Sequence, residues 1–484
     1  MKKKIKISLF VFIVIGVVVL NITYKNKNEV TKTKRKSQSS LTIMIKGEGA
    51  SDYTKSTSKD IPKGNYVLNE EKTHCENNGK ILSYDNTTGK ISFSFIGSDR
   101  CYLYFDYEVP KRIGYEAILL DNGLGVTTVE EAKQNIENKG TPDFSTVVTI
   151  NEGMYAAKDD LGTSYYFRGA VDNNWIKYGQ ENGKDIYWRI IRINGDNTIR
   201  MIYSGTIAPT SDTAIIMPGT GTQITIDIAN TFSFNNSYND PVYVGYMYTL
   251  GEQHGNSTSS TIKTIVDNWY KTTTLATAPT TKSLVADQIF CNDRSAATSK
   301  SDTPGEINGS MSTSTTYYYG AYIRLIANKT PKLTCTTVSD RFTVKASTGN
   351  GALDYPVGLI TADEVAMAGD VWGIGSKTSN SYLNTKQHSW SGSPYFFNGS
   401  IAFEFYGIST GLLLGNGVNY TIGIRPVISL SADVKLSGDG TWNNVYTVSW
   451  DLFDNVEWVG KLVPYFLIFG KVCHFYGKSD TFCL

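Results

Sequence analysis

Apolar and polar positions alternate with the period of a β-strand over several stretches near the start of the chain. In the segment ISFSFI at 91–96 the large apolar residues alternate with serines. Strand-type composition recurs at 65–68 and 102–107, and turn-forming Asn, Asp, Thr and Gly separate these stretches. Apolar residues at every second position lie on the same face of a strand, and that face packs toward a core. We therefore predict a small β domain at 61–110.

A helical period appears later in the chain. Ile262, Ile265, Val266 and Trp269 fall at i, i+3, i+4 and i+7, which gives one apolar face and predicts a helix at about 259–271.

Three further helices follow from shorter signals. A threonine followed three residues later by a glutamate forms a capping box, and it predicts helices from 127 or 128 to about 138 and from 361 to about 368. Apolar spacing predicts another helix at about 281–290.

The segment YWRIIRINGDNTIRMIYSG at 187–205 predicts a β-hairpin. Its Asn-Gly-Asp-Asn sequence separates two runs rich in β-branched and aromatic residues, which is typical of a hairpin turn. We expect Arg189, Arg192 and Arg200 to line the solvent face of this hairpin. Together these elements indicate an α+β, β-rich chain.

The amino terminus carries an export signal. Four lysines within the first six residues precede an apolar run at 7–22, and no small-x-small cleavage site follows. We interpret 1–24 as an uncleaved signal-anchor helix in the cell membrane, with a single pass and the bulk of the chain outside the cell. Six basic residues at 25–36 count against this orientation under the positive-inside rule.

Composition narrows the functional classes. The formal net charge is +1 and charged residues make up 19% of the chain, so no basic patch supports a nucleic-acid partner. Abundant Thr, Ser, Asn, Gly and Tyr are typical of β-rich extracellular domains. Cys75 and Cys101 flank one small unit and Cys291 and Cys335 flank another segment; paired disulfides suit export, although the sequence leaves the connectivity open.

Residues 388–430 contain the strongest sequence signal for a binding site. Between His388 and Tyr420 there are eight aromatic residues, six glycines and a single charge, Glu404. Aromatic side chains with Ser, Gly and Asn are the usual residues of recognition loops, and a soluble protein seldom exposes so many apolar side chains unless a partner covers them. Packing of the same aromatics in a β-rich core is the alternative, and composition leaves it open.

This stretch resembles a known family. The framework consists of Trp390-x-x-Ser393-Pro394, Gly399-x-x-Ala402-Phe403, Ser409-Thr410-Gly411-x-Leu413 and Gly423-x-Arg425-Pro426-Val427. It is similar to the C-terminal part of membrane-anchored surface proteins of gut bacteria of the Firmicutes type. The run at 152–175 is similar to the same proteins.

The resemblance implies a C-type-lectin-like fold of the kind shared with formylglycine-generating enzymes and with the variable proteins of diversity-generating retroelements. In the variable proteins a fixed framework holds freely exchanged positions that bind the target. Here the exchanged, ligand-binding positions would be Ser389, Tyr395, Phe396, Asn398, Ile401, Glu404, Phe405, Tyr406, Leu412, Leu414, Asn416 and Tyr420.

The expected organisation follows from these signals. It comprises a signal-anchor at 1–24, a flexible stalk at 25–60, a small β domain at 61–110, a lead-in segment at 111–184, a C-type-lectin-like domain at 185–448 and an atypical extension at 449–484. Within the stalk, a short edge strand at 41–45 is the alternative. We expect a cell-surface adhesin or receptor that binds an extracellular protein or glycan. The alternatives are a formylglycine-generating type of enzyme and a structural envelope protein.

Catalytic and metal-binding patterns are weak in the sequence. The four histidines lie in different segments, no Cys-x-x-Cys occurs, and the segment from 336 to 448 has no cysteine for formylglycine chemistry. We expect no catalytic residue, no zinc site and an exposed, inert His254. Calcium at Asp159 and Asp160 stays open as a cofactor, although adjacent acids more often form a solvated turn.

Overall fold

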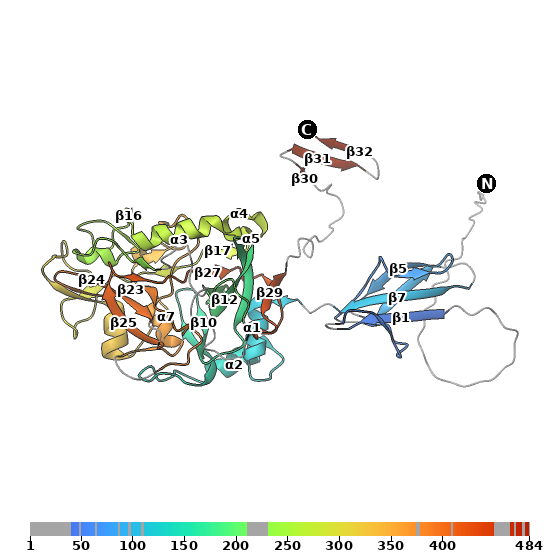
Figure 1. Ribbon diagram of the computed structural model, residues 1–484, viewed down its shortest axis with the longest axis horizontal. Helices are drawn as coiled ribbons and strands as arrows, with labels where there is room; N and C mark the ends of the chain where they lie inside the picture. The colour runs from blue at the N-terminus through green and yellow to red at the C-terminus, as the bar shows by residue number, and fades with distance from the viewer. Residues whose placement is uncertain are drawn as a thin grey trace, which may run out of the picture. The chain divides into compact units, whose positions relative to one another are not determined.

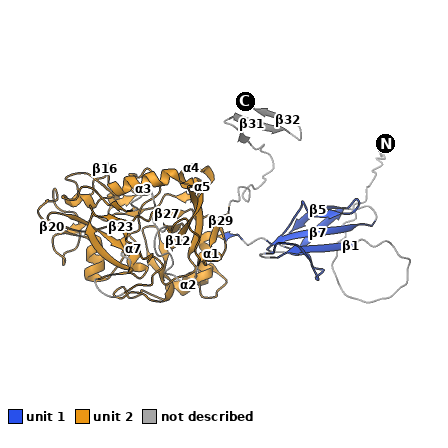
Figure 2. Cartoon of the chain, viewed as in Figure 1, with its two compact units in different colours: residues 1–112 blue, residues 113–484 orange. Residues whose placement is uncertain are grey.

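The computed structural model describes residues 40–47, 50–62, 65–85, 88–94, 98–107, 111–210, 231–373, 378–407, 410–449, 465–468, 471–476 and 480–483. The chain divides into two compact units, 1–112 and 113–484 (Figure 2). The expected signal-anchor at 1–24 lies outside the described residues. None of the helices within those residues is long and apolar enough to cross a membrane.

The smaller unit is a pair of β-sheets around a short core. Five strands form one sheet: β1 (Ser40–Lys46), β2 (Thr54–Lys55), β3 (Tyr66–Leu68), β4 (His74–Cys75) and β7 (Arg100–Tyr107). The hairpin of β5 (Lys80–Asp85) and β6 (Lys90–Ser94) forms the other, and its apolar side chains pack on Ile43, Leu103 and Phe105. The predicted small β domain is present, and Cys75 and Cys101 form a disulfide within it.

The stalk predicted at 25–60 is wrong for the residues from Ser40 onward. β1 pairs in parallel with β7 along its whole length, from Ser40 opposite Arg100 to Lys46 opposite Asp106. Ile43 is only 5% exposed, because the alternating apolar residues of LTIMI supply one face of the core. Residues that we predicted to be part of a stalk, because the region is polar, therefore form a strand of the smaller unit.

The larger unit is built on a curled ten-stranded sheet (Figure 1). Its strands are β8 (Arg112–Ile113), β9 (Asn151–Lys158), β10 (Thr163–Gly169), β11 (Trp175–Glu181), β12 (Lys184–Ile193), β13 (Ile199–Tyr203), β17 (Val285–Ala286), β27 (Val427–Leu430), β28 (Lys435–Ser437) and β29 (Tyr446–Ser449). The predicted hairpin is confirmed as β12 and β13, which pair antiparallel.

The lead-in segment at 111–184 belongs to this sheet, so its separation from a domain starting at 185 is wrong. β11 pairs with β12, with Trp175 opposite Arg189, and β10 pairs with the other end of β12. Hydrogen bonds between strands on either side of residue 184 decided this boundary, and no change in composition marks it.

Helix predictions were mostly confirmed. The helices are α1 (Gly114–Asn122), α2 (Val129–Glu137), α3 (Thr261–Thr272), α4 (Thr274–Thr277), α5 (Pro279–Ser283), α6 (Gly320–Tyr322) and α7 (Ala362–Met367), with a π-helix η2 (Ile323–Asn328) and 3₁₀ turns η1 (Pro241–Val244) and η3 (Val338–Asp340). Thr128 caps α2, and Thr361 with Glu364 forms a complete capping box on α7. The helix predicted at 281–290 is wrong, because Val285 and Ala286 are extended and pair with β27.

A second, six-stranded sheet carries most of the aromatic-rich stretch. Its order is β19 (Ala296–Ala297), β20 (Thr316–Tyr319), β23 (Ser389–Asn398), β24 (Ala402–Gly407), β25 (Leu412–Gly417) and β22 (Val371–Trp372). The expectation of loops over 388–430 is therefore wrong: much of this stretch is antiparallel sheet.

Smaller strand pairs complete the chain. They are β14 (Phe232–Ser233) with β26 (Thr421–Ile422), β15 (Met247–Tyr248) with β16 (Thr258–Ser259), β18 (Phe290–Cys291) with β21 (Arg341–Phe342), and the sheet of β30 (Tyr465–Ile468), β31 (Lys471–Tyr476) and β32 (Asp480–Cys483).

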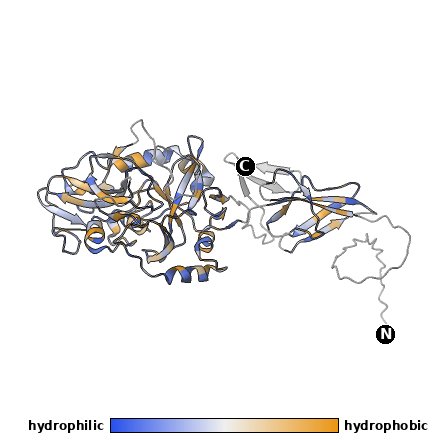
Figure 3. Ribbon diagram, turned by 60° about the horizontal axis from the view of Figure 1, so that its bottom comes forward, coloured by the Kyte–Doolittle hydropathy of each residue, from blue (hydrophilic) through white to orange (hydrophobic). Residues whose placement is uncertain are grey.

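One hydrophobic core connects the two large sheets. It includes the fully buried indoles of Trp188, Trp269 and Trp390. Apolar stretches follow the strands of the larger unit (Figure 3). The sheet that carries the aromatic-rich stretch therefore shares its core with the ten-stranded sheet.

Candidate functional site

Three neighbouring strands place aromatic side chains in register. Tyr318 on β20 lies opposite Phe396 on β23, and Phe396 lies opposite Phe403 on β24. Directly opposed residues share one face of a sheet. The rings of Phe396 and Phe403 are stacked with centroids 4.5 Å apart, and those of Tyr318 and Phe396 are near-parallel at 6.4 Å. All three side chains are half-buried, so they form a surface row.

Tyr395 widens this row. The register of β23 shifts between Pro394 and Phe396, and this irregularity leaves both Tyr395 and Phe396 half-buried. The Tyr395 ring lies on Gly415 of β25, where an added Cβ would come within 2.1 Å of the ring. Glycine at that position therefore provides the space that the tyrosine occupies.

Two residues from outside the three strands join the cluster. The ring of Tyr322, from α6, lies 5.1 Å from that of Tyr395 and 4.9 Å from that of Tyr318. Trp372, on β22, forms a hydrogen bond with Tyr395; burial raises the pKa of Tyr395 and this bond partly offsets the effect. We call Tyr318, Tyr322, Trp372, Tyr395, Phe396 and Phe403 the aromatic face.

Two lysines flank the aromatic face. The Lys300 ammonium lies over the rings of Tyr318 and Tyr322, 5.4 and 5.7 Å from their centroids. The Lys329 ammonium lies 5.6 Å from the centroid of the Trp372 ring. Such cation–π contacts hold a charge beside an apolar surface.

The structure separates the twelve residues that the resemblance assigned to ligand binding. Tyr395 and Phe396 lie in the aromatic face. Ile401 and Tyr420 lie beside Gly417, which is opposite Phe403, so they border the face. Asn398 is exposed at the end of β23.

Three of the twelve expectations are wrong for the folded chain. Glu404, Phe405 and Leu412 are 0%, 0% and 2% exposed, so a partner cannot reach them. Phe405 lies beneath Tyr395, with ring centroids 4.7 Å apart. Strand alternation places Glu404 on the opposite face from Phe403, and that face is packed into the core.

The remaining four residues are also not part of the aromatic face. Tyr406, Leu414 and Asn416 share the strand face of Glu404, since Tyr406 is opposite Leu414 and Glu404 is opposite Asn416. Ser389 is half-buried at the start of β23. The twelve positions therefore do not converge on one surface.

Sequence reasoning missed four members of the aromatic face: Tyr318, Tyr322, Trp372 and Phe403, the last of which was assigned to the fixed framework. Tyr318 belongs to the run Tyr317-Tyr318-Tyr319, in which only the middle ring is half-exposed and the outer two are buried. That run was a usable signal, because an aromatic strand next to aromatic β23 indicates cross-strand pairing. Tyr322 and Trp372 gave no comparable signal, and their positions depend on the packing of α6 and β22.

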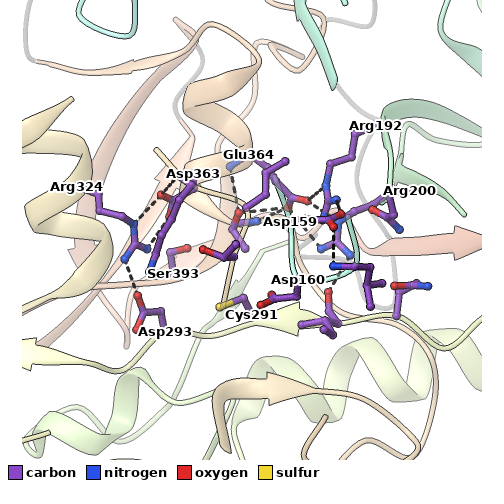
Figure 4. A pocket seen from close by; sticks show the side chains of 18 residues that line it. Asp159, Asp160, Arg192, Arg200, Cys291, Asp293, Arg324, Asp363, Glu364 and Ser393 are labelled. Carbon is purple, nitrogen blue, oxygen red and sulfur yellow. Dashed lines mark hydrogen bonds and ion pairs between the residues drawn. The ribbon is translucent and has the colours of Figure 1, made fainter. Parts of the chain in front are cut away.

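A network of buried charges lies elsewhere in the larger unit (Figure 4). Arg192 pairs with both Asp159 and Glu364 at 2.9 Å, and Arg200 pairs with Glu364 at 2.6 Å. Burial opposes ionisation, yet Arg200 and Arg192 hold the pKa of Glu364 below its usual value. In the same network Arg324 pairs with Asp293 at 2.6 Å and with Asp363 at 2.8 Å.

The predicted solvent exposure of the hairpin arginines is wrong. Arg189, Arg192 and Arg200 are 1%, 7% and 1% exposed. The charged side chains suggested that this face of the hairpin is exposed to solvent. Segments before and after the hairpin in sequence cover the face and supply the partners of the arginines. The cavity among these charges is about 30 Å³, which holds about two water molecules. The network joins segments that are distant along the chain.

The calcium hypothesis does not fit the contacts of its two aspartates. Asp159 accepts hydrogen bonds from the amides of Gly162 and Gly195 in addition to its pair with Arg192. Asp160 accepts a hydrogen bond from the amide of Cys335 and pairs with Arg341 at 3.1 Å. Calcium needs six to eight oxygen ligands, whereas these carboxylates face guanidinium groups.

His254 is not the exposed residue that we expected. Its side chain is 11% exposed, and its Nδ1 lies 3.0 Å from both carboxylate oxygens of Asp340. Arg294 donates to the same carboxylate. The loop position in the sequence concealed a partner that is 86 residues away.

Cys291 and Cys335 of the larger unit form a disulfide. Comparison of the chain with protein-family models, with curated proteins and with solved structures finds no match.

Proposed function

We propose that this chain is a membrane-anchored cell-surface binding protein, with a C-type-lectin-like larger unit that recognises an extracellular protein or glycan through the aromatic face. The observation that carries the proposal is the contiguous set of half-buried rings on β20, β22, β23 and β24. Large aromatic side chains in a rigid, partly exposed cluster are the residues that contribute most to protein interfaces. The apolar run at 7–22 would anchor the chain.

The rings are held in place before any partner arrives. Each makes ring contacts at 4.5–6.4 Å with neighbours on other strands or on α6, or a hydrogen bond such as that from Trp372. A preorganised surface loses little conformational entropy on binding. This favours recognition over a purely structural role in the envelope.

The enzymatic alternative has less support. A formylglycine-generating type of reaction requires reactive thiols, whereas Cys291 and Cys335 are joined in a disulfide. Cys335 is also only 1% exposed.

The experiment is a binding screen with the full chain in nanodiscs on arrays of glycans and of extracellular proteins. We expect saturable binding by the wild type and a loss of about 30-fold or more in the Tyr318→Ala/Phe396→Ala variant, because interface hot spots contribute 2 kcal/mol or more. Leu124→Ala is the control, since that side chain is 78% exposed and lies in a loop outside the aromatic face.

Two outcomes contradict the proposal. Binding that survives loss of the rings places the site elsewhere, and no saturable binding to either array favours an envelope protein. The melting temperature of each variant is measured in parallel, because unfolding of the double variant would indicate core packing and not recognition.

Diversification of the surface has its own test. Deep sequencing of the last third of the gene in one cultured population should show substitutions at half-buried or exposed positions such as Tyr395 and Asn398, while Trp390 and Arg425 stay fixed. Buried Glu404 and Phe405 should vary less than their neighbours. A uniform stretch removes the retroelement hypothesis and leaves a receptor of fixed specificity.

A further inference from the structure

The two lysines beside the aromatic face have no neutralising carboxylate among the residues that the structure describes. Neither Lys300 nor Lys329 pairs with a carboxylate in the described structure, whereas many of its other buried or half-buried cations do. Lys300 is exposed and forms a hydrogen bond with Tyr322. The aromatic face is thus bordered by two positive charges available to a partner.

Lys329 is held in an unusual backbone conformation. It follows the π-helix η2 with φ 55° and ψ 40°, a left-handed geometry that side chains other than glycine rarely adopt. Its Nζ donates to the carbonyl of Leu325 at 3.0 Å, while its ammonium also lies near the Trp372 ring. Strained residues of this kind persist where the surrounding structure fixes them, and they cluster at ligand-binding positions.

The stacked pair of Phe396 and Phe403 in the aromatic face is poorly equipped for a polyhydroxylated ligand. A sugar presents many hydroxyls, and each one that is desolvated needs a hydrogen-bond partner. Phe396 and Phe403 cover one face of each other's ring by stacking at 4.5 Å, and they carry no polar atom. The nearest carboxylate on these strands, that of Glu404, is buried on the opposite side of the sheet.

An apolar group with nearby acidic groups matches this surface better. The rings would accept an apolar or aromatic side chain, and the lysines at the two ends would attract carboxylates through charge complementarity. A protein segment supplies both kinds of group within a few residues.

We propose that the partner is a protein whose contact segment carries an apolar anchor flanked by Asp or Glu, with carboxylates directed at Lys300 and Lys329. This inference rests on the proposed function and names the chemistry of its ligand. It assigns to the two lysines the role of selecting acidic partners.

The test is selection from a random 12-residue peptide library displayed on phage, against the immobilised full chain. We expect the wild-type pool to be enriched in Asp and Glu next to aromatic residues. The best synthetic peptide should bind about tenfold or more weakly to Lys300→Glu/Lys329→Glu, and its affinity for the wild type should fall with added salt. Lys282→Glu/Lys345→Glu is the matched control, because it makes the same change in charge at exposed lysines elsewhere.

The outcomes separate this inference from the proposed function. The inference is overturned if the selected peptides need Tyr318 and Phe396 for binding but are neutral or basic. It is also overturned if their affinity does not change when the lysines are replaced. In both cases the proposed binding function stands. Peptides whose affinity changes with neither the rings nor the lysines overturn both the inference and the proposed function. A selection in which the wild type enriches no peptide over the Tyr318→Ala/Phe396→Ala variant also overturns both. A glycan that binds through the rings in place of an acidic peptide overturns the inference alone.

The single variant Lys300→Glu tests the inference even if the double variant misfolds. Lys300 is exposed and lies outside the helices and strands, so its replacement leaves the fold intact. We expect it to weaken peptide binding in the same direction as the double variant. Unchanged affinity in Lys300→Glu, with a double variant that no longer melts cooperatively, contradicts the inference.

Discussion

Replacement of Glu404 by glutamine should stabilise the protein at neutral pH. Glu404 is fully buried on β24, and neither carboxylate oxygen has a hydrogen-bond partner within the described residues. Burial in this setting raises the pKa of Glu404 well above its ordinary value of 4.5. The folded chain therefore keeps this carboxyl protonated at pH values where the unfolded chain releases the proton.

The sign and size of the effect follow from proton linkage. Because the folded state binds more protons than the unfolded state above pH 4.5, the free energy of unfolding decreases as pH rises, until the folded-state pKa is passed. The slope is about 1.4 kcal/mol per pH unit for one group, so the cost reaches up to about 3 kcal/mol at pH 7. Glutamine has the same shape and no proton to lose, and it leaves a similar unpaired polar group in the same place.

The assay is urea unfolding followed by tryptophan fluorescence at pH 5 and pH 8. All eight tryptophans lie in the larger unit, so the signal reports the unit that contains Glu404. We expect Glu404→Gln to match the wild type near pH 5 and to exceed it in free energy of unfolding at pH 8. Glu306→Gln, at an exposed position, should show no such difference. A constant difference between Glu404→Gln and the wild type at both pH values refutes the reasoning.

For three other variants, the contacts of the replaced residues predict a loss of stability or of partner binding. Loss of the disulfide in Cys291→Ser/Cys335→Ser should lower the free energy of unfolding by about 4 kcal/mol in urea, because the bridge closes a loop with a sequence separation of 44. Glu364→Ala should cost about 3–5 kcal/mol in the same measurement, since it leaves two buried arginines without their shared carboxylate. Gly415→Ala should weaken partner binding in a titration, because its Cβ displaces the Tyr395 ring.

Each of these outcomes has a matched comparison. Alanine at Gly305, which has open space around it, should leave partner binding unchanged. Reduction of the wild type should reproduce the disulfide variant, and a reduced protein of unchanged stability contradicts the entropic argument. A cost for Glu364→Ala below that of an exposed Glu306→Ala would mean that the arginines find other partners.

Local signals predicted many of the individual elements. The Thr361 capping box and the apolar face of Ile262 to Trp269 lie on helices because the required contacts are within a few residues. The hairpin of β12 and β13 followed from its turn sequence. At 285–286 the local pattern failed, since pairing with β27, more than 140 residues later, imposed an extended backbone.

The candidate site was predictable only in part. The sequence identified the aromatic-rich stretch and singled out Tyr395 and Phe396, which are half-buried members of the aromatic face. It could not distinguish them from Phe405, which the Tyr395 ring covers, or from Glu404, which lies on the opposite face of the sheet. Lys300, Tyr322 and Lys329 reach the same surface through α6, η2 and the segment before β20, which are far from β23 along the chain.

The sequence by itself determined the β-rich class, the main turns and caps, and the concentration of aromatic residues near 388–430, since these depend on composition and on contacts between near neighbours. Tertiary structure decided which arginines and acids are buried, that β1 belongs to the smaller unit, and which rings share a surface with the two lysines. These properties depend on pairing between strands and on packing between distant segments, and neither leaves a local pattern along the chain.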